Sequence, residues 1–416
     1  MTRRIPLLAV LALFPAAAAG QVPAGPEFQV NTYTTSFQTH AAVAADAAGN
    51  FVVAWGSNLQ DGSNYGIFAR RYSAAGTPLG PTFVPVNSYT SGNQVVPSVA
   101  ADATGKLVFV WESIGQDGSD RGIFGRRFNA AGTPLGTEFQ VNTFTTSVQR
   151  WPRVSSDADG DFVVAWQSIG QAGFGYSVFA RRYTAAGTPL GAEFQVASQT
   201  TAEAWFPDVA SEAGGDFVVV WAGYASGVAG FEVFGRRHDS TGAAIGSDFK
   251  VNTYTTGAQL HARVAFGEAG GFVVAWASAV QDGGGYGVFG QRYDAGGAAQ
   301  GAEFAVNSYM TGKQYHPAVA ADADGNFVVT WTSEFQDGSG RGIFGKRYDR
   351  FGAPEGAEFR VNSFTNSTQI YPAVATAASG DFVVAWQSSF QDGSFYGIFA
   401  QRFRPDVIFK DGFQAP

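Results

Sequence analysis

The chain of 416 residues contains no cysteine, which excludes disulfides and thiolate-bound metal ions. It has only five lysines and a formal net charge of −8, so it lacks the basic surface that binding to nucleic acid or anionic lipid requires. After the first twenty residues, no apolar run is long enough to form a transmembrane helix. The aromatic content of 15% is nevertheless ample for a large core, so burial alone must hold the fold together.

The first twenty residues have the pattern of an export signal. Arg3 and Arg4 form a basic start, residues 5–14 are mostly apolar, and residues 17–20 are small, as in a cleavage zone. The apolar stretch is too short to span a bilayer. We therefore expect residues 1–20 to be a cleaved signal peptide and the mature protein to be secreted or periplasmic.

A tryptophan recurs along the chain, once after 56 residues and five times after 55 residues. Such a period is typical of solenoids and propellers, in which each repeat buries its apolar faces against its neighbours. The tryptophans are Trp55, Trp111, Trp166, Trp221, Trp276, Trp331 and Trp386. An arginine keeps the same register at Arg71, Arg127, Arg182, Arg237, Arg292, Arg347 and Arg402. The chain therefore holds seven copies of one repeat.

Each copy contains four short runs that favour β-strands, and the sixth copy shows them clearly. The runs are 317–321, 327–331, 342–348 and 358–361, and the Asp-Ala-Asp-Gly turn at 322–325 joins the first two. No part of the repeat has helical periodicity. Four antiparallel strands per copy form one propeller blade, so we predict an all-β, seven-bladed β-propeller.

The two ends of the repeat region are complementary. Residues 27–31 resemble a fourth strand with no blade before it, and the last copy stops after its third strand at Phe403. We therefore predict a propeller domain over residues 27–403, in which the N-terminal strand completes the seventh blade and leaves no free sheet edge. Residues 404–416 form a tail, for which surface attachment and docking on the propeller are alternative roles.

The segment 319–329, Val-Ala-Ala-Asp-Ala-Asp-Gly-Asn-Phe-Val-Val, resembles the first hairpin of bacterial β-propeller repeats, including those of the NHL type. The downstream Gln-Asp-Gly-Ser and Gly-Ile-Phe-Gly-Lys-Arg-Tyr segments resemble secreted bacterial repeat proteins. The resemblance extends over residues 27–403. It implies the fold and says little about function, because propellers host many activities.

The residues that recur in every copy are best interpreted as structural. The tryptophans fit core packing, and the arginines fit contacts between blades, where they bond carbonyl groups or a carboxylate. Five Gln-Asp-Gly loops carry an aspartate each, and calcium binding is the alternative to turn formation there. A single carboxylate per loop favours turn formation. These aspartates are Asp61, Asp117, Asp282, Asp337 and Asp392.

The copies differ most near the start of the first strand, which we expect to lie next to the central channel. The residue directly before the repeated valine is small in four copies, but three consecutive copies have Arg153, Asp208 and Arg263. We expect the Asp208 carboxylate to be shared by both guanidinium groups, which leaves one positive charge. Three residues before the valine, the series is His40, Val96, Trp151, Phe206, His261, His316 and Tyr371.

This sector is the predicted ligand site. Guanidinium groups hold a carboxylate or sulfate, and aromatic faces stack on rings, so the ligand expected is anionic or sugar-like. The competing interpretation is a salt bridge between blades beneath ordinary core aromatics. The candidate residues are Arg150, Trp151, Arg153, Trp205, Phe206, Asp208, His261, Arg263, His316 and Tyr371.

No complete catalytic constellation is present. The four histidines lack the short spacings of metal sites, and no nucleophile elbow, phosphate-binding loop or dinucleotide fingerprint occurs. We therefore predict no catalytic residue, no metal and no cofactor, and we expect a monomer.

Three functions stay open. The first is an exported, non-catalytic module that binds a glycan or another extracellular or envelope component. The second is a lyase or hydrolase that acts on an acidic glycan, with Arg153 or Arg263 holding a carboxylate and His261 or Tyr371 transferring a proton. The third is a protein-interaction scaffold.

Overall fold

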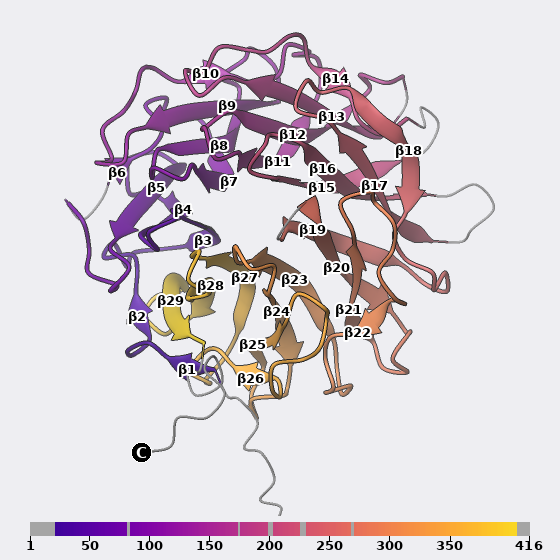
Figure 1. Ribbon diagram of the computed structural model, residues 1–416. Coiled ribbons are helices and arrows are strands. Elements are labelled where there is room, and N and C mark those ends of the chain that lie inside the picture. Colours follow the sequence, from indigo (N-terminus) through magenta and orange to yellow (C-terminus); the bar gives the residue numbers. More distant parts are fainter. Residues whose placement is uncertain are drawn as a thin grey trace, which may run out of the picture.

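The computed structural model describes residues 21–80, 84–173, 175–198, 203–224, 230–267 and 270–405. Over these residues the chain forms seven antiparallel sheets arranged in a ring, as the view down the axis shows (Figure 1). The predicted seven-bladed all-β propeller with four strands per blade is therefore confirmed. In this part of the chain no helix has the length and apolarity needed to cross a membrane. The predicted signal peptide and residues 406–416 of the tail lie outside the described residues.

Each blade is built outward from the ring centre in chain order. The innermost strands are β3 (Gln38–Ala45), β7 (Gln94–Ala101), β11 (Gln149–Ser156), β15 (Ala204–Ser211), β19 (Gln259–Phe266), β23 (Gln314–Ala321) and β27 (Gln369–Thr376). The second strands are β4 (Phe51–Asn58), β8 (Leu107–Ile114), β12 (Phe162–Ile169), β16 (Phe217–Tyr224), β20 (Phe272–Ala279), β24 (Phe327–Glu334) and β28 (Phe382–Ser389).

The outer half of each blade is more variable in length. The third strands are β5 (Tyr65–Tyr72), β9 (Arg121–Phe128), β13 (Tyr176–Tyr183), β17 (Phe231–His238), β21 (Tyr286–Tyr293), β25 (Arg341–Tyr348) and β29 (Tyr396–Arg404). The outermost strands are β2 (Phe28–Gln29), β6 (Val84–Pro85), β10 (Phe139–Gln140), β14 (Phe194–Gln195), β18 (Ala244–Lys250), β22 (Phe304–Ala305) and β26 (Phe359–Arg360). The fourth strand predicted at 358–361 thus shrinks to two residues, whereas the first strand begins three residues earlier than predicted.

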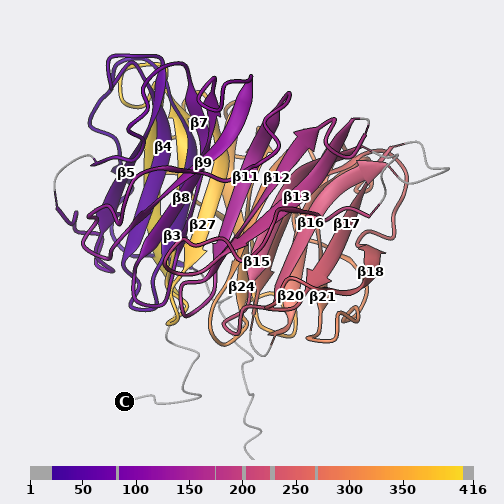
Figure 2. The ribbon, with the colours of Figure 1, turned by 90° about the horizontal axis from the view of Figure 1, so that it is seen from above.

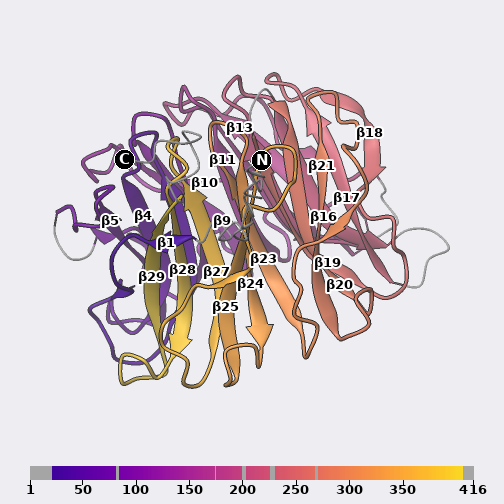
Figure 3. The same ribbon diagram turned by 60° about the horizontal axis from the view of Figure 1, so that its bottom comes forward.

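The ring closes as predicted, with an N-terminal strand in the last blade. Strand β2 pairs with β29 at Phe28 and Ala400, and a further short strand, β1 (Val22–Pro23), pairs with the end of β29. The indigo strand β1 and the yellow strand β29 accordingly lie side by side (Figure 3). At this join the Asn31 side chain accepts a hydrogen bond from the Ile398 N–H at 2.7 Å and donates to Asp392 at 3.2 Å.

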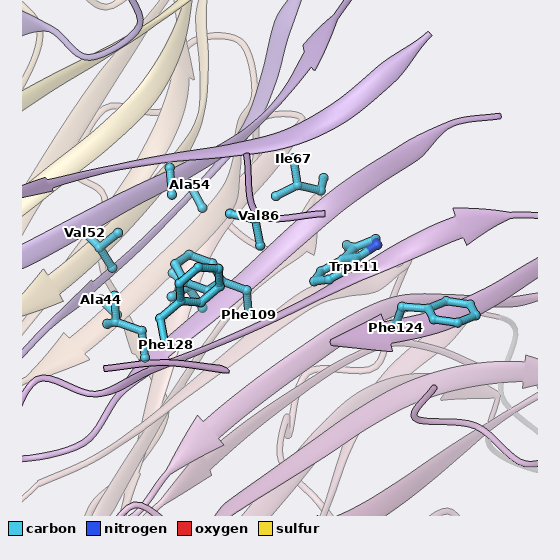
Figure 4. Packing of buried hydrophobic residues seen from close by; sticks show 12 residues of the cluster. Ala44, Val52, Ala54, Ile67, Val86, Phe109, Trp111, Phe124 and Phe128 are labelled. Atoms are coloured by element: carbon cyan, nitrogen blue, oxygen red, sulfur yellow. The ribbon is translucent and has the colours of Figure 1, made fainter. Parts of the chain in front are cut away.

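The core lies between the blades, whose sheets stand side by side around the ring (Figure 2). Seven clusters of buried apolar residues occur in the described part of the chain, one between each pair of neighbouring blades. Between the first two blades, one cluster joins Val52 and Ala54 of β4 with Phe109 and Trp111 of β8 (Figure 4). The second strands are therefore covered on both faces, which is why they read as continuous apolar runs rather than alternating ones.

The repeated arginines join blades, as predicted. Arg71 donates to the Ala131 carbonyl at 2.6 Å, in the turn between the third and fourth strands of the next blade. Arg402 of the last blade reaches Ala75 of the first blade at 2.5 Å, so this contact also spans the closure. Arg347 also reaches the next blade, at the Gly380 carbonyl at 3.5 Å, and in addition its guanidinium pairs with Glu355 of its own blade at 3.2 Å.

The Asn31→Ala substitution tests the join. It leaves the buried Ile398 N–H without an acceptor, so we expect a loss of about 1–3 kcal/mol in the free energy of unfolding, measured by urea denaturation. Asn58→Ser is the control, since the seventh blade has Ser389 at the same position, and it should change stability by less than about 0.5 kcal/mol. Equal stability of the two variants would contradict this account of the closure.

Candidate functional site

The seven innermost strands surround a central cavity of about 480 Å³, a volume in the range of small-ligand sites. Every blade contributes residues to its wall. Eight of the ten candidate residues line it: Trp151, Arg153, Phe206, Asp208, His261, Arg263, His316 and Tyr371. The prediction that these positions face the channel agrees with the structure, whereas Arg150 and Trp205 do not belong to the lining.

A β-bulge shapes the wall in every blade. The strand register shifts at the same place in all seven innermost strands, for example between Arg150 and Arg153 in β11. The bulged residue has a positive φ of 50° to 58° in each blade, although none of these residues is glycine. In five blades the next residue is proline, which has no N–H to donate and disfavours the right-handed helical conformation before it. The bulge thus sets the side-chain direction at this position in each blade.

The bulged residues form a closed belt of rings around the cavity. Successive ring centroids lie 4.3 to 6.2 Å apart, and the smaller Val96 occupies the seventh position. We call this set the aromatic belt; in order around the cavity it comprises His40, Trp151, Phe206, His261, His316 and Tyr371. The sequence prediction left His40 out of the site, although His40 stood in the same series as the other five.

Neighbouring blades hold part of the belt in place through side chains of their second strands. The Trp151 backbone N–H donates to the Glu112 side chain at 2.8 Å, and the Phe206 backbone N–H donates to the Gln167 side chain at 2.9 Å. Glu112 is fully buried and also pairs with Arg121 at 2.7 Å. Glu112, which departs from the repeat, therefore has a structural role, because its carboxylate holds both the Trp151 backbone and Arg121.

The charged residues next to the belt are not arranged as predicted. Arg153 pairs with Asp208 at 3.5 Å, but the second Asp208 oxygen accepts the Val264 backbone N–H at 3.0 Å. Ser98 does the same in blade 2, where it accepts the Val154 N–H at 3.2 Å. The prediction of one carboxylate shared by two guanidinium groups is therefore wrong, because the backbone takes the second oxygen.

The Arg263 guanidinium contacts the Ala262 carbonyl at 2.9 Å, and within the described residues it forms no ion pair. Burial, and then the nearby Arg263, lower the pKa of Arg153 to about 10, so the Arg153 guanidinium stays charged at neutral pH. Together with Asp208 the two arginines give the cavity wall one net positive charge.

The imidazoles in the belt are neutral at pH 7. Burial lowers the pKa of His40 and of His261 to about 4, and the nearby arginines add to the effect. Burial and the neighbouring His261 lower the pKa of His316 to about 2. Nδ1 of His40 and Nδ1 of His316 are buried and have no hydrogen-bond partner among the described residues.

Arg150 and Trp205 lie beside the belt but point elsewhere. The Arg150 guanidinium stacks over Trp151 at 5.4 Å from the ring centroid. The Trp205 indole N–H donates to Glu203 at 2.7 Å, and its ring contacts Phe206 edge-on at 5.9 Å. Both therefore lie just outside the cavity, next to the bulged residue whose side chain lines it.

The acidic loops are turns. Asp392 accepts the Ser394 N–H at 3.1 Å and bonds Asn31, and Asp117 has the same two kinds of contact. In blade 4 the carboxylate of Glu232 bonds Asn252 instead. Across the described ranges, no three His, Asp or Glu side chains gather as a metal site requires.

No protein-family model and no curated protein matches the chain. Solved structures do match. A protein of unknown function from Dyadobacter fermentans has a TM-score of 0.53 and 10% identity, over 93% of this chain and 99% of that chain. An α-L-arabinanase from Penicillium chrysogenum, complexed with arabinobiose, has a TM-score of 0.50 and 12% identity, over 74% of this chain and 92% of that chain.

An α-L-arabinofuranosidase from Fusarium graminearum has a TM-score of 0.47 and 11% identity, over 91% of this chain and 98% of that chain. The likeness shows the fold alone. The arabinanase is a glycan-acting enzyme and not an NHL repeat protein. The propeller part of the predicted resemblance is therefore supported, and the NHL-type part is not.

The imidazoles predict a pH-dependent stability. Their pKa is about 6.5 in the unfolded chain and lower in the fold, so the unfolded state takes up protons first and stability falls from about pH 6.5 toward pH 4. His261→Phe puts at this position the residue type that blade 4 has there. The variant should be more stable than the wild type at pH 5 by about 1–2 kcal/mol, measured by urea unfolding. The same advantage at pH 7.5 would show that packing, not protonation, is responsible.

Proposed function

We propose that this protein is a non-catalytic module that binds an anionic glycan in its central cavity. The observation that carries the proposal is the closed aromatic belt next to Arg153 and Arg263. Ring faces suit the C–H faces of sugars, and guanidinium groups suit carboxylate or sulfate. The predicted signal peptide would bring such a module to glycans outside the cytoplasm.

The composition of the wall favours binding over hydrolysis. Most glycosidases need two carboxyl groups that flank the bond to be cleaved. Among the described residues that line the cavity, Asp208 is the sole carboxylate, and it is engaged with Arg153 and the backbone. The lyase alternative would use His261, whose pKa of about 4 makes it a weak base. Release of unsaturated, ultraviolet-absorbing ends from a uronate polymer would support the lyase and contradict the proposal.

Arg263→Ala is the direct test. Blades 1, 6 and 7 have alanine at this position, so the fold should tolerate the change. We expect acidic oligosaccharides selected on a glycan array to bind about 10-fold or more weakly in calorimetric titration, since a charge-assisted hydrogen bond contributes about 1.5–3 kcal/mol. Arg360→Ala, at an exposed position on β26, is the matched control and should bind like the wild type. Unchanged binding by Arg263→Ala would exclude this site.

Asp208→Ser tests the charge balance of the same wall. Serine should keep the bond to the Val264 N–H, as Ser98 does in blade 2, while it removes the negative charge beside Arg153. We expect acidic ligands to bind about 3- to 10-fold more tightly, in the same titration and with a steeper salt dependence. Weaker binding would mean that Asp208 itself contacts the ligand.

A further inference from the structure

A second group of aromatic residues lies beside the cavity at one end of blade 4. Trp205 is near the start of β15, Tyr224 ends β16 and Phe231 begins β17, and the pairing of these strands brings the three to the same edge. None of the three lines the central cavity. We call Trp205, Phe231 and Tyr224 the blade-4 platform.

The platform continues the aromatic belt without a break. The Trp205 ring lies 5.9 Å from Phe206 in the belt and 4.9 Å from Phe231, and Phe231 lies 4.2 Å from Tyr224. Exposure increases along this path, from the half-buried Trp205 to Tyr224, which is 42% exposed. A ligand that starts in the cavity can therefore continue over successive rings to the surface.

The orientation of Trp205 is fixed. One Glu203 oxygen accepts both the Trp205 indole N–H at 2.7 Å and the Tyr176 backbone N–H at 2.9 Å. Blades 1, 2, 3 and 5 have Thr39, Val95, Arg150 and Leu260 at the Trp205 position. The repeat therefore does not require a large aromatic residue there, and blade 4 presents one that is held ready for contact.

The border of the platform is acidic. Glu203, Asp248 and Tyr224 enclose a small hollow of about 20 Å³, and Arg236 offsets only the Asp248 charge, at 3.5 Å. Carboxylate oxygens accept hydrogen bonds from sugar hydroxyls but repel a uronate or sulfate. The platform thus suits neutral sugar units, whereas the cavity, with its net positive charge, suits an acidic one.

We infer that the ligand is a glycan whose terminal unit is acidic and whose following units are neutral. The terminal unit occupies the central cavity, and the neutral units lie across Trp205, Phe231 and Tyr224. This inference rests on the proposed function of the cavity and narrows its ligand class. A polymer with an acidic group on every unit is disfavoured, because its outer units would meet the Glu203 carboxylate, for which the described residues provide no ion pair.

The test compares ligand lengths and charges by calorimetric titration. The probes are N-acetylneuraminic acid, a monosialylated lacto-N-tetraose with its sialic acid at the chain end, neutral lacto-N-tetraose and pentagalacturonic acid. For the wild type we expect the sialylated pentasaccharide to bind at least about 10-fold more tightly than the acidic monosaccharide, because stacked sugar units add contact area. Pentagalacturonic acid should gain nothing comparable from its length.

The variants use residues that other blades already have at this position. Trp205→Leu, as in blade 5, should reduce the affinity for the pentasaccharide to that for the monosaccharide and leave the monosaccharide unaffected. Trp205→Tyr, as in blade 6, should stay within about 3-fold of the wild type, since it keeps an aromatic face. Equal weakening of both ligands by Trp205→Leu, or tight binding of pentagalacturonic acid, would overturn the inference.

Failure of the platform and failure of the cavity give different results. If Arg263→Ala leaves monosaccharide binding intact, the cavity is not the acidic site, whatever Trp205 does. If Arg263→Ala abolishes that binding but chain length and Trp205→Leu have no effect, the cavity is supported as the acidic site and the blade-4 platform is excluded as a sugar site. Absence of binding by all four probes counts against both.

Discussion

Everything in this ring depends on the burial of each sheet between two neighbours. The second strand of every blade is covered on both faces, so no blade can leave the ring without exposing two apolar surfaces. A chain without cysteine has no covalent cross-link to replace that burial. The join between β2 and β29 completes the seventh blade, and the buried Asn31 makes there the same bond to a backbone N–H that Asn87, Asn142, Asn252, Asn307 and Asn362 make in other blades.

Because the blades must stay packed, some departures from the repeat only replace a hydrogen bond that the other blades make with different residues. Where blade 4 lacks the aspartate that bonds the buried asparagine, Glu232 supplies the carboxylate to Asn252. In blade 3, Ala197 stands at the position of the buried asparagine, and the Gln195 side chain donates to Ser177 and to the Ala197 carbonyl. These changes supply hydrogen bonds inside the blade and give no information about a ligand. Trp205 and the belt residues are different, because their side chains face a cavity or the surface rather than a buried partner.

The sequence predicted the fold and most of the cavity wall because both follow from periodicity. Equivalent residues of seven copies must occupy equivalent places around an axis, which brought Trp151, Phe206 and His261 together correctly. Periodicity could not predict the bulge, because it does not fix the strand register. A one-residue shift in register decides which side chains face the axis. For that reason Trp205 was placed in the cavity; His40 was left out although it stood in the same series as the other five belt residues. The hydrogen bond from the Val264 N–H to Asp208 could not be predicted either, since backbone partners depend on strand register.

The bulge has a consequence for how such proteins diversify. Valine, tryptophan, phenylalanine, histidine and tyrosine all occupy the same left-handed backbone position, so the blades keep this conformation with several different side chains. The seven positions therefore carry different side chains around one opening, and six of these side chains contact one another in the belt. Point mutations can exchange the groups at these positions one by one while the packing between blades stays as it is. Two propellers with identical cores could in this way differ completely in what they recognise.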